Sequence, residues 1–221
     1  MTNTTLKNPW HNLPKKSPYI LPEDLELIQH HRHFSNLRLD ALPGQIIGGL
    51  DTAEVVFLLL NPGFNENDVA VDIKLPGFIE DNQSNHLDPY NSPFLYFNKG
   101  YELTGGYKWW TRILKPLIQA DVPVTTLRNK IMTIEYFPYH SKDWKDLPRI
   151  PSQQFAFDLV HEAIDRNKII VIRSPKRWIE AVPELAEYPY VTFRSQLNVS
   201  VSPKNIGEEN FNNIKSRIIG K

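Results

Sequence analysis

The chain of 221 residues contains no cysteine. This absence excludes disulfide bonds, thiolate nucleophiles, zinc–thiolate sites and iron–sulfur clusters held by cysteine. It is consistent with a reducing compartment. An excess of either charge is also missing, because Lys and Arg together number 25 and so do Asp and Glu. Proteins dedicated to duplex DNA usually carry a basic excess, so composition does not support that function, although a local groove can still be basic.

Long apolar runs are absent as well. No stretch approaches the about 20 apolar residues that span a bilayer, and residues 1–5 lack the zones of a signal peptide. We therefore expect a cytoplasmic protein with no membrane partner. The length fits one larger α/β domain, so we expect a single domain over residues 1–221, with 1–20 as an extended N-terminal arm.

Helical and strand patterns alternate along the chain. Apolar residues at helical spacing predict helices over residues 22–34, 109–118, 155–164, 175–182 and 211–218. The unbroken apolar run over residues 55–60 predicts a core strand, and apolar segments predict further strands over residues 130–137, 168–173 and 190–194. Residues 64–106 lack a regular pattern, and residues 198–205 are expected to form a loop. This order predicts a three-layer α/β/α fold with a central four-stranded, mostly parallel sheet.

A peptide rich in polar, proline or aromatic residues follows each expected strand. In a parallel sheet the ligand crevice lies at the carboxyl ends of the strands, so these peptides are expected to converge on one site. The peptides are Asn61-Pro62-Gly63-Phe64, Glu135-Tyr136-Phe137-Pro138-Tyr139-His140-Ser141, Arg173-Ser174-Pro175-Lys176 and Ser200-Val201-Ser202-Pro203-Lys204-Asn205. We expect the working site to centre on the first of them.

An apolar strand ending in Asn61-Pro62-Gly63, with Ser202-Pro203 after the fourth strand, resembles the uracil-DNA glycosylase superfamily. The similarity is greatest to its mismatch-specific and single-strand-selective branches, and this chain would be a divergent member. It covers roughly residues 54–214 in element order and is carried by short motifs. The resemblance implies the fold of that superfamily, a nucleobase bound at the carboxyl ends of the strands, and hydrolysis of an N-glycosidic bond in DNA.

The resemblance also implies roles for residues around the first strand. Asn61 matches the asparagine that positions the attacking water. Gly63 and Phe64 match the loop beside the flipped base. Phe94, within Ser92-Pro93-Phe94, is expected to be the aromatic residue that stacks on the base.

Two further positions carry a residue type that differs from the family pattern. Glu135 lies where the family often has a base-reading asparagine, and Ser200, in the last motif with Ser202, replaces the catalytic histidine or its asparagine substitute. An ionised carboxylate only accepts hydrogen bonds, so Glu135 suits a base edge rich in donors or has to be protonated. Ser200 cannot supply an imidazole to stabilise charge on the leaving base. These differences leave the identity of the base open.

Hydrolysis of an N-glycosidic bond requires a held water, a stabilised leaving base and a base kept outside its stack. Asn61 can orient the water but is a poor base, so a carboxylate is needed nearby. The candidate carboxylates are Glu66, Asp68 and Glu135. The candidate phosphate contacts are Lys176 and Lys204, and His140 is a further candidate for substrate binding.

Three functions stay open at this point. The first is a glycosylase-like enzyme acting on a base in DNA, and the second is a non-catalytic protein that binds nucleic acid or a nucleotide. The third is a hydrolase of small metabolites that uses His140 and Ser141. The plain structural interpretations are a turn at Asn61-Pro62-Gly63 and core packing for Trp109 and Trp110. No cofactor and no metal are expected.

Overall fold

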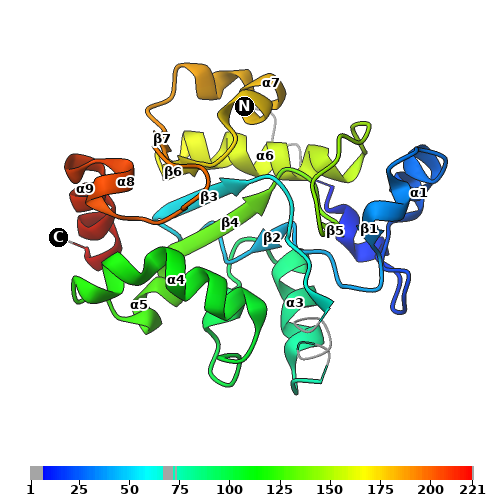
Figure 1. The fold of residues 1–221 in the computed structure, drawn as a ribbon, viewed down its shortest axis with the longest axis horizontal. Coiled ribbons are helices and arrows are strands. Elements are labelled where there is room, and N and C mark those ends of the chain that lie inside the picture. Colours follow the sequence, from blue (N-terminus) through cyan, green and yellow to red (C-terminus); the bar gives the residue numbers. More distant parts are fainter. Residues whose placement is uncertain (1–6, 67–71, 73, 221) are drawn as a thin grey trace.

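The computed structural model describes residues 7–66, 72 and 74–220. A five-stranded sheet lies at its centre, with helices on both faces (Figure 1). The strand order is β2 (Ile46–Ile47), β4 (Ile131–Glu135), β3 (Val55–Leu59), β6 (Ile169–Ile172) and β7 (Val191–Thr192). The last four pair in parallel, and β2 runs antiparallel to β4. The mostly parallel sheet is confirmed, but the expected number of four strands is wrong, because the two residues of β2 are too few to form a recognisable run.

Strand β3 shows why the sheet is covered on both faces. Successive side chains of a strand point to opposite faces. Val55, Phe57 and Leu59 belong to one apolar cluster, and Val56 and Leu58 belong to another. The first cluster includes side chains of α4 (Gly105–Gln119), α5 (Val124–Lys130) and α9 (Glu208–Ile219), and the second includes those of α6 (Ser152–Asp165) and α7 (Pro175–Ala181). The three layers are therefore helices, sheet and helices.

The order of the parallel strands fixes where a crevice opens. From β3 the chain moves to β4 on one side, and later returns to β6 on the other side of β3. Such a reversal is the point where ligands bind in open α/β sheets, outside the carboxyl ends of the strands. In this chain the reversal lies between β3 and β6.

The long connection between β3 and β4 differs from the expectation of an irregular segment. It contains α3 (Phe78–Leu87) and a 3-10 turn, η3 (Leu95–Phe97). The buried residues of α3 include Asn82, Asn85 and His86, so the helix has no apolar stripe that a sequence pattern could reveal. Helix α5 is a further element that the sequence pattern does not predict, and α8 (Pro203–Ile206) lies within the expected loop over residues 198–205.

Residues 7–20, the described part of the expected N-terminal arm, are not extended throughout. A 3-10 helix, η1 (Pro9–Asn12), places Trp10 in the core with 2% of its surface exposed, and Trp10 Nε1 donates to Gln45 Oε1 at 3.2 Å. Helix α1 (Pro22–Ile28) is shorter than expected and is followed by η2 (Phe34–Asn36). A second, two-stranded sheet then pairs β1 (Leu37–Arg38) with β5 (His140–Ser141).

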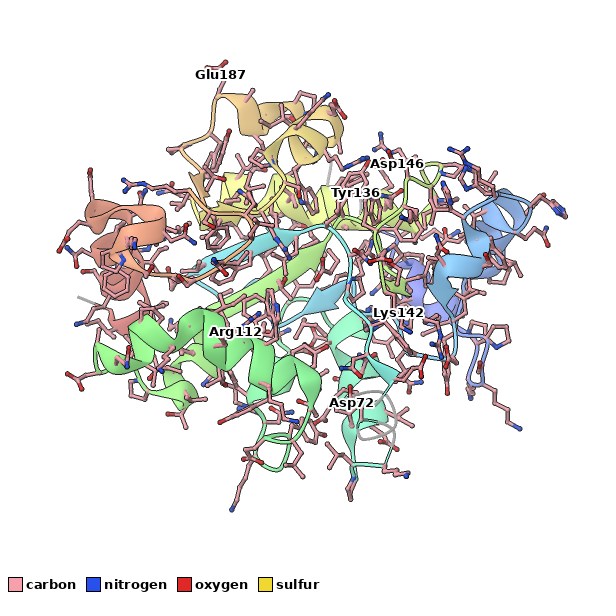
Figure 2. The ribbon with its side chains drawn as sticks, in the orientation of Figure 1. Asp72, Arg112, Tyr136, Lys142, Asp146 and Glu187 are labelled. Carbon is pink, nitrogen blue, oxygen red and sulfur yellow. The ribbon has the colours of Figure 1, made fainter. Side chains whose placement is uncertain are left out.

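The remaining predicted elements are confirmed with shifted ends. Helix α4 starts at Gly105, ahead of the expected start, because Thr104 Oγ1 caps it by accepting a 3.0 Å hydrogen bond from Tyr107 N–H. The strands are shorter than their apolar runs, and a 3-10 turn, η4 (Pro183–Ala186), follows α7. Tyr136 lies just after β4 (Figure 2). Its ring packs against Phe157 of α6 at 5.5 Å between ring centroids. Among the described residues, no helix has the length and apolar character to cross a membrane.

Candidate functional site

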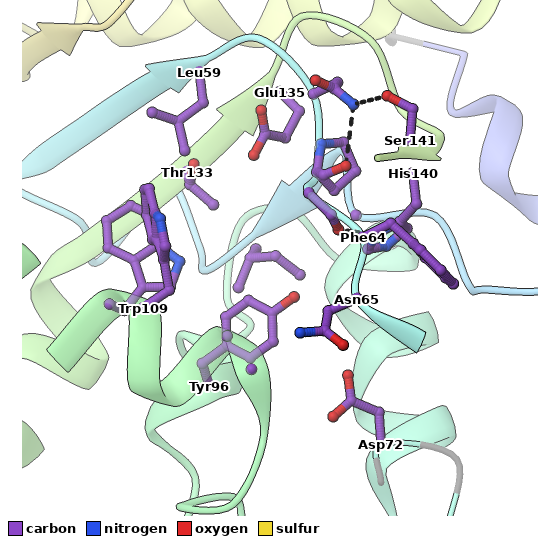
Figure 3. A pocket seen from close by; sticks show the side chains of 18 of the residues that line it. Leu59, Phe64, Asn65, Asp72, Tyr96, Trp109, Thr133, Glu135, His140 and Ser141 are labelled. Atoms are coloured by element: carbon purple, nitrogen blue, oxygen red, sulfur yellow. Dashed lines mark hydrogen bonds between the residues drawn. The ribbon is translucent and has the colours of Figure 1, made fainter. Parts of the chain in front are cut away.

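A pocket of about 410 Å³ opens at the carboxyl ends of β3, β4 and β6 (Figure 3). Its lining includes Asn61 to Asn65 after β3, Thr133 and Glu135 of β4, and Arg173 after β6. Small-molecule sites typically measure about 300–1,000 Å³, so the pocket has room for a ligand of nucleobase or nucleoside size. Three of the four strand-end peptides therefore converge, at the reversal of strand order.

Asn61 is held in a fixed orientation just beyond the carboxyl end of β3. Its Nδ2 donates to Ser141 Oγ at 2.8 Å and to the Pro62 carbonyl at 3.1 Å (Figure 3). A backbone bridge between Gly63 and Ser141 keeps the two segments together. Because both hydrogen bonds use the amide nitrogen, Oδ1 is the atom of Asn61 that is left to accept a hydrogen bond from a water or a ligand.

Glu135 is the last residue of β4 and lines the same pocket with only 6% of its surface exposed. Its Oε2 atom is buried with no hydrogen-bond partner among the described residues. Burial raises the pKa of Glu135 to about 8, and the positive charge of Arg173 only partly opposes this. At neutral pH the carboxyl group is therefore mostly protonated, and it carries one donor and one acceptor as an amide does.

Aromatic side chains form much of the remaining wall. They are Phe64, Tyr96, Trp109 and Trp110. Trp110 is buried against Phe57 at 5.2 Å between centroids, and Trp109 meets it edge-on at 4.8 Å. The guanidinium of Arg38 lies 3.9 Å from the ring centre of Phe64 and covers one face of that ring.

Phe94 does not reach the pocket. It is fully buried in the core, where it packs edge-on against Trp110 at 5.0 Å between centroids. The 3-10 turn that follows places Tyr96, two residues later, in the pocket wall instead. The expectation that an aromatic residue of this connection lines the site therefore applies to Tyr96, and the choice of Phe94 is corrected.

His140 lines the pocket from β5, as expected for the peptide after β4. Its Nδ1 lies 2.6 Å from the Gly63 carbonyl oxygen, and a carbonyl only accepts, so Nδ1 carries the hydrogen. Burial lowers the pKa of His140, and backbone hydrogen bonds to Gly63 and Leu42 oppose that shift only in part. His140 consequently supports the loop at Gly63.

The last motif lies outside the pocket. Ser200 and Ser202 hydrogen-bond each other at 3.0 Å between their Oγ atoms, and Ser202 caps α8 by accepting from Asn205 N–H at 3.3 Å. Lys204 is exposed on α8, and none of these three residues is among those that line the pocket. Ser200 is therefore not brought together with Asn61 and Glu135.

The other candidate carboxylates differ from Glu135. Glu66 is exposed and pairs with Arg38 and Lys142, each at 3.4 Å, and it does not line the pocket. Asp68 lies outside the described residues.

Several lining residues were not predicted. They are Asp72, Tyr96, Thr133 and Lys142. Arg173 also lines the pocket, as expected for the strand-end peptide that begins with it. The unpredicted residues depend on how the long connection and the segment after β4 fold, which no local pattern indicates.

No protein-family model, no curated protein and no solved structure matches this chain. Within the described part of the chain, no three His, Asp or Glu side chains are grouped in a way that could hold a metal ion. The functional argument therefore starts from the pocket and its side chains.

Proposed function

We propose that the protein binds a nucleobase in this pocket and hydrolyses the N-glycosidic bond that joins it to a nucleotide in DNA. The observation that carries the proposal is the placement of Asn61 and Glu135 at neighbouring strand ends in one pocket with aromatic walls. The first residue supplies an acceptor for water, and the second supplies a polar contact for the base. Asn61 and Glu135 also occupy the two sequence positions at which the glycosylase superfamily, which this chain resembles, has polar side chains.

The walls of the pocket suit a flat, polar ring. Phe64, Tyr96 and Trp109 are each partly exposed and line the pocket, so their rings are available to a ligand. Stacking of a base on an aromatic side chain contributes about 1–3 kcal/mol. Protonated Glu135 then pairs with an edge that offers an acceptor beside an N–H donor, as nucleobases do.

Asn61 is the residue that holds the water. Its amide nitrogen is fixed by Ser141 and Pro62, so rotation of the side chain is restrained and Oδ1 keeps its direction. A water that donates to Oδ1 is oriented for attack on the sugar carbon as the bond to the base breaks. Positioning of this kind is a recognised source of rate acceleration.

The alternative of a metabolite hydrolase using His140 and Ser141 has less support. Successive residues of a strand point to opposite sides. Ser141 Oγ accepts a hydrogen bond from Asn61, and His140 Nδ1 is engaged with the Gly63 carbonyl. The two side chains therefore do not form a nucleophile and base pair.

The experiment is a base-release assay with oligonucleotides that carry single deaminated or damaged bases, in single-stranded and duplex form. We expect release of free base, and we expect Asn61→Ala to abolish it. Asn129→Ala is the matched control, because Asn129 is exposed on α5 away from the pocket. Binding of oligonucleotides without release in any substrate would support a binding module instead, and no binding of bases, nucleosides or oligonucleotides at millimolar concentration would refute the proposal.

A further inference from the structure

Glu135 is a buried carboxyl group with an oxygen atom that no described residue binds. Its Oε2 atom has no hydrogen-bond partner within the described residues, although the position is 6% exposed. An unpaired buried polar atom costs about 1–3 kcal/mol, so its retention in a pocket calls for an explanation. A ligand that completes its hydrogen bonding provides one.

We propose that Glu135 is the catalytic acid of this site and transfers a proton to the base as the base leaves. This inference rests on the proposed function of the pocket. Its geometric basis is that Glu135 ends β4 and Asn61 lies just beyond β3, the parallel strand paired with it, where Leu59 is opposite Glu135. The base and the water therefore meet two different side chains at one edge of the sheet.

The pKa of Glu135 is set mainly by burial, and one cation of the pocket opposes it. The other ionisable groups that line the pocket are Asp72, Tyr96, His140, Lys142 and Arg173. Burial dominates the pKa of Glu135 and raises it to about 8, whereas Arg173 lowers it. Arg173 is therefore the group placed to stabilise the carboxylate that remains after proton transfer.

None of these neighbours replaces Glu135 as the proton donor. Burial raises the pKa of Tyr96, and the charges of Asp72 and Glu135 raise it further, so its hydroxyl is a very weak acid. Burial lowers the pKa of His140, and its Nδ1 hydrogen is bound to the Gly63 carbonyl. Lys142 is exposed and pairs with Glu66 at 3.4 Å.

The step balances without any further reactant. The bond between the sugar carbon C1′ and the base nitrogen breaks, and its electron pair goes to the base. The Glu135 carboxyl proton moves to a ring nitrogen or oxygen of the base, which leaves as a neutral molecule. The water held by Asn61 adds to C1′, and the proton that it loses returns to the Glu135 carboxylate through solvent. The products are free base and a sugar hydroxyl, as hydrolysis requires.

The proton donor defines a class of substrate. A base that leaves as a neutral molecule needs an acceptor atom that faces the acid, and the second oxygen of Glu135 accepts from an adjacent N–H. The site therefore favours bases with a ring nitrogen or oxo group beside an amino or imino group. It also removes the need for an imidazole at the position of Ser200, because the leaving base does not carry a full negative charge.

The test compares wild type, Glu135→Gln and Glu135→Ala in single-turnover base release from pH 6 to pH 9. Gln keeps a donor and an acceptor but cannot release a proton, so we expect the rate to fall about 10²–10⁴-fold while the affinity for free base stays close to that of wild type. Glu135→Ala should lose both the rate of base release and the affinity for free base. The wild-type rate should fall as pH rises through about 8, and the residual rate of Glu135→Gln should not. Glu180→Gln, on the exposed face of α7, is the matched control.

Two outcomes overturn the assignment. One is an unchanged rate in Glu135→Gln, together with a loss in Asn61→Ala, which rejects the acid and keeps the proposed function. The other is a midpoint well below pH 7 for the carboxyl carbon of Glu135 in an NMR titration of the wild-type protein. Absence of base release from wild type on every oligonucleotide would reject the acid and the hydrolytic function together.

Discussion

The hydroxyl of Tyr139 donates a 2.5 Å hydrogen bond to Asp24 Oδ2, and the same hydroxyl accepts one from the Leu21 backbone N–H at 3.1 Å. The other carboxyl oxygen of Asp24 accepts from Ser152 N–H at 3.1 Å. Asp24 belongs to α1 and Ser152 begins α6, so this network ties both helices to the segment after β4. That segment continues directly into His140 and Ser141, which line the pocket.

Tyr139→Phe is expected to destabilise the protein by about 1–3 kcal/mol, because it leaves a buried Asp24 oxygen and the Leu21 N–H without their partner. Urea unfolding at pH 7 measures the change in the free energy of unfolding. Tyr190→Phe is the matched control, because the Tyr190 hydroxyl has no hydrogen bond to the described residues and its removal should cost little. Equal losses in both variants would contradict the role given to the network.

Glu135 should make the protein less stable as pH rises. Its pKa is about 8 in the folded protein against an ordinary value of 4.5, so the folded state binds more protons between these values. The free energy of unfolding should therefore fall by up to about 1.4 kcal/mol per pH unit across this window from this group alone. Glu135→Gln removes the titration, and its unfolding free energy should exceed that of wild type above pH 8. A wild-type curve parallel to that of Glu135→Gln between pH 5 and pH 8 would contradict the prediction.

His86 should have the opposite effect, at acid pH. It is buried beside Trp10, and burial lowers its pKa from 6.5 to about 4. The unfolded chain binds the proton first, so stability is complete above pH 6.5 and is lost as pH falls toward 4. His86→Asn keeps an N–H donor for the Asn82 carbonyl, which accepts from His86 Nδ1 at 2.9 Å. We expect its unfolding free energy to vary less between pH 7 and pH 4.5 than that of wild type, with His30→Asn, at an exposed position, behaving as wild type.

The features of the fold that the sequence predicts are those with a strong local pattern. The run from Val55 to Leu60 indicates a doubly buried strand because apolar residues fill both faces, and β3 indeed contributes to both clusters. The shared position of Asn61 and Glu135 in one pocket follows from that strand and from the rule on carboxyl ends.

The features that sequence patterns do not reveal depend on contacts between distant segments. The buried side of α3 contains Asn82, Asn85 and His86, whose hydrogen bonds hold them in the core. Phe94 and Tyr96 are equally good aromatic candidates by sequence, and only the turn at η3 decides which one faces the pocket. The protonation state of Glu135 has the same origin, since burial by other segments raises its pKa.

Two glycines of the pocket wall are expected to respond to substitution in different ways. At Gly63 an added Cβ would meet no atom within 4 Å, whereas at Gly106 it would overlap the ring of Tyr96. Gly63→Val should therefore leave the free energy of unfolding within about 0.5 kcal/mol of wild type. Gly106→Ala should displace the Tyr96 ring and cost about 1–3 kcal/mol through overpacking.

Ligand binding separates the two glycines further. The isopropyl group introduced by Gly63→Val enters open space at the pocket, so the affinity for a free base should fall by about 1–3 kcal/mol, or roughly 5-fold to 150-fold. Gly63→Ala adds one methyl group and should have a smaller effect in the same direction. Calorimetric titration with free bases and urea unfolding of the same preparations give both quantities. If Gly63→Val binds as wild type does, the ligand does not occupy the space beside Asn61, and the water would have to be held elsewhere.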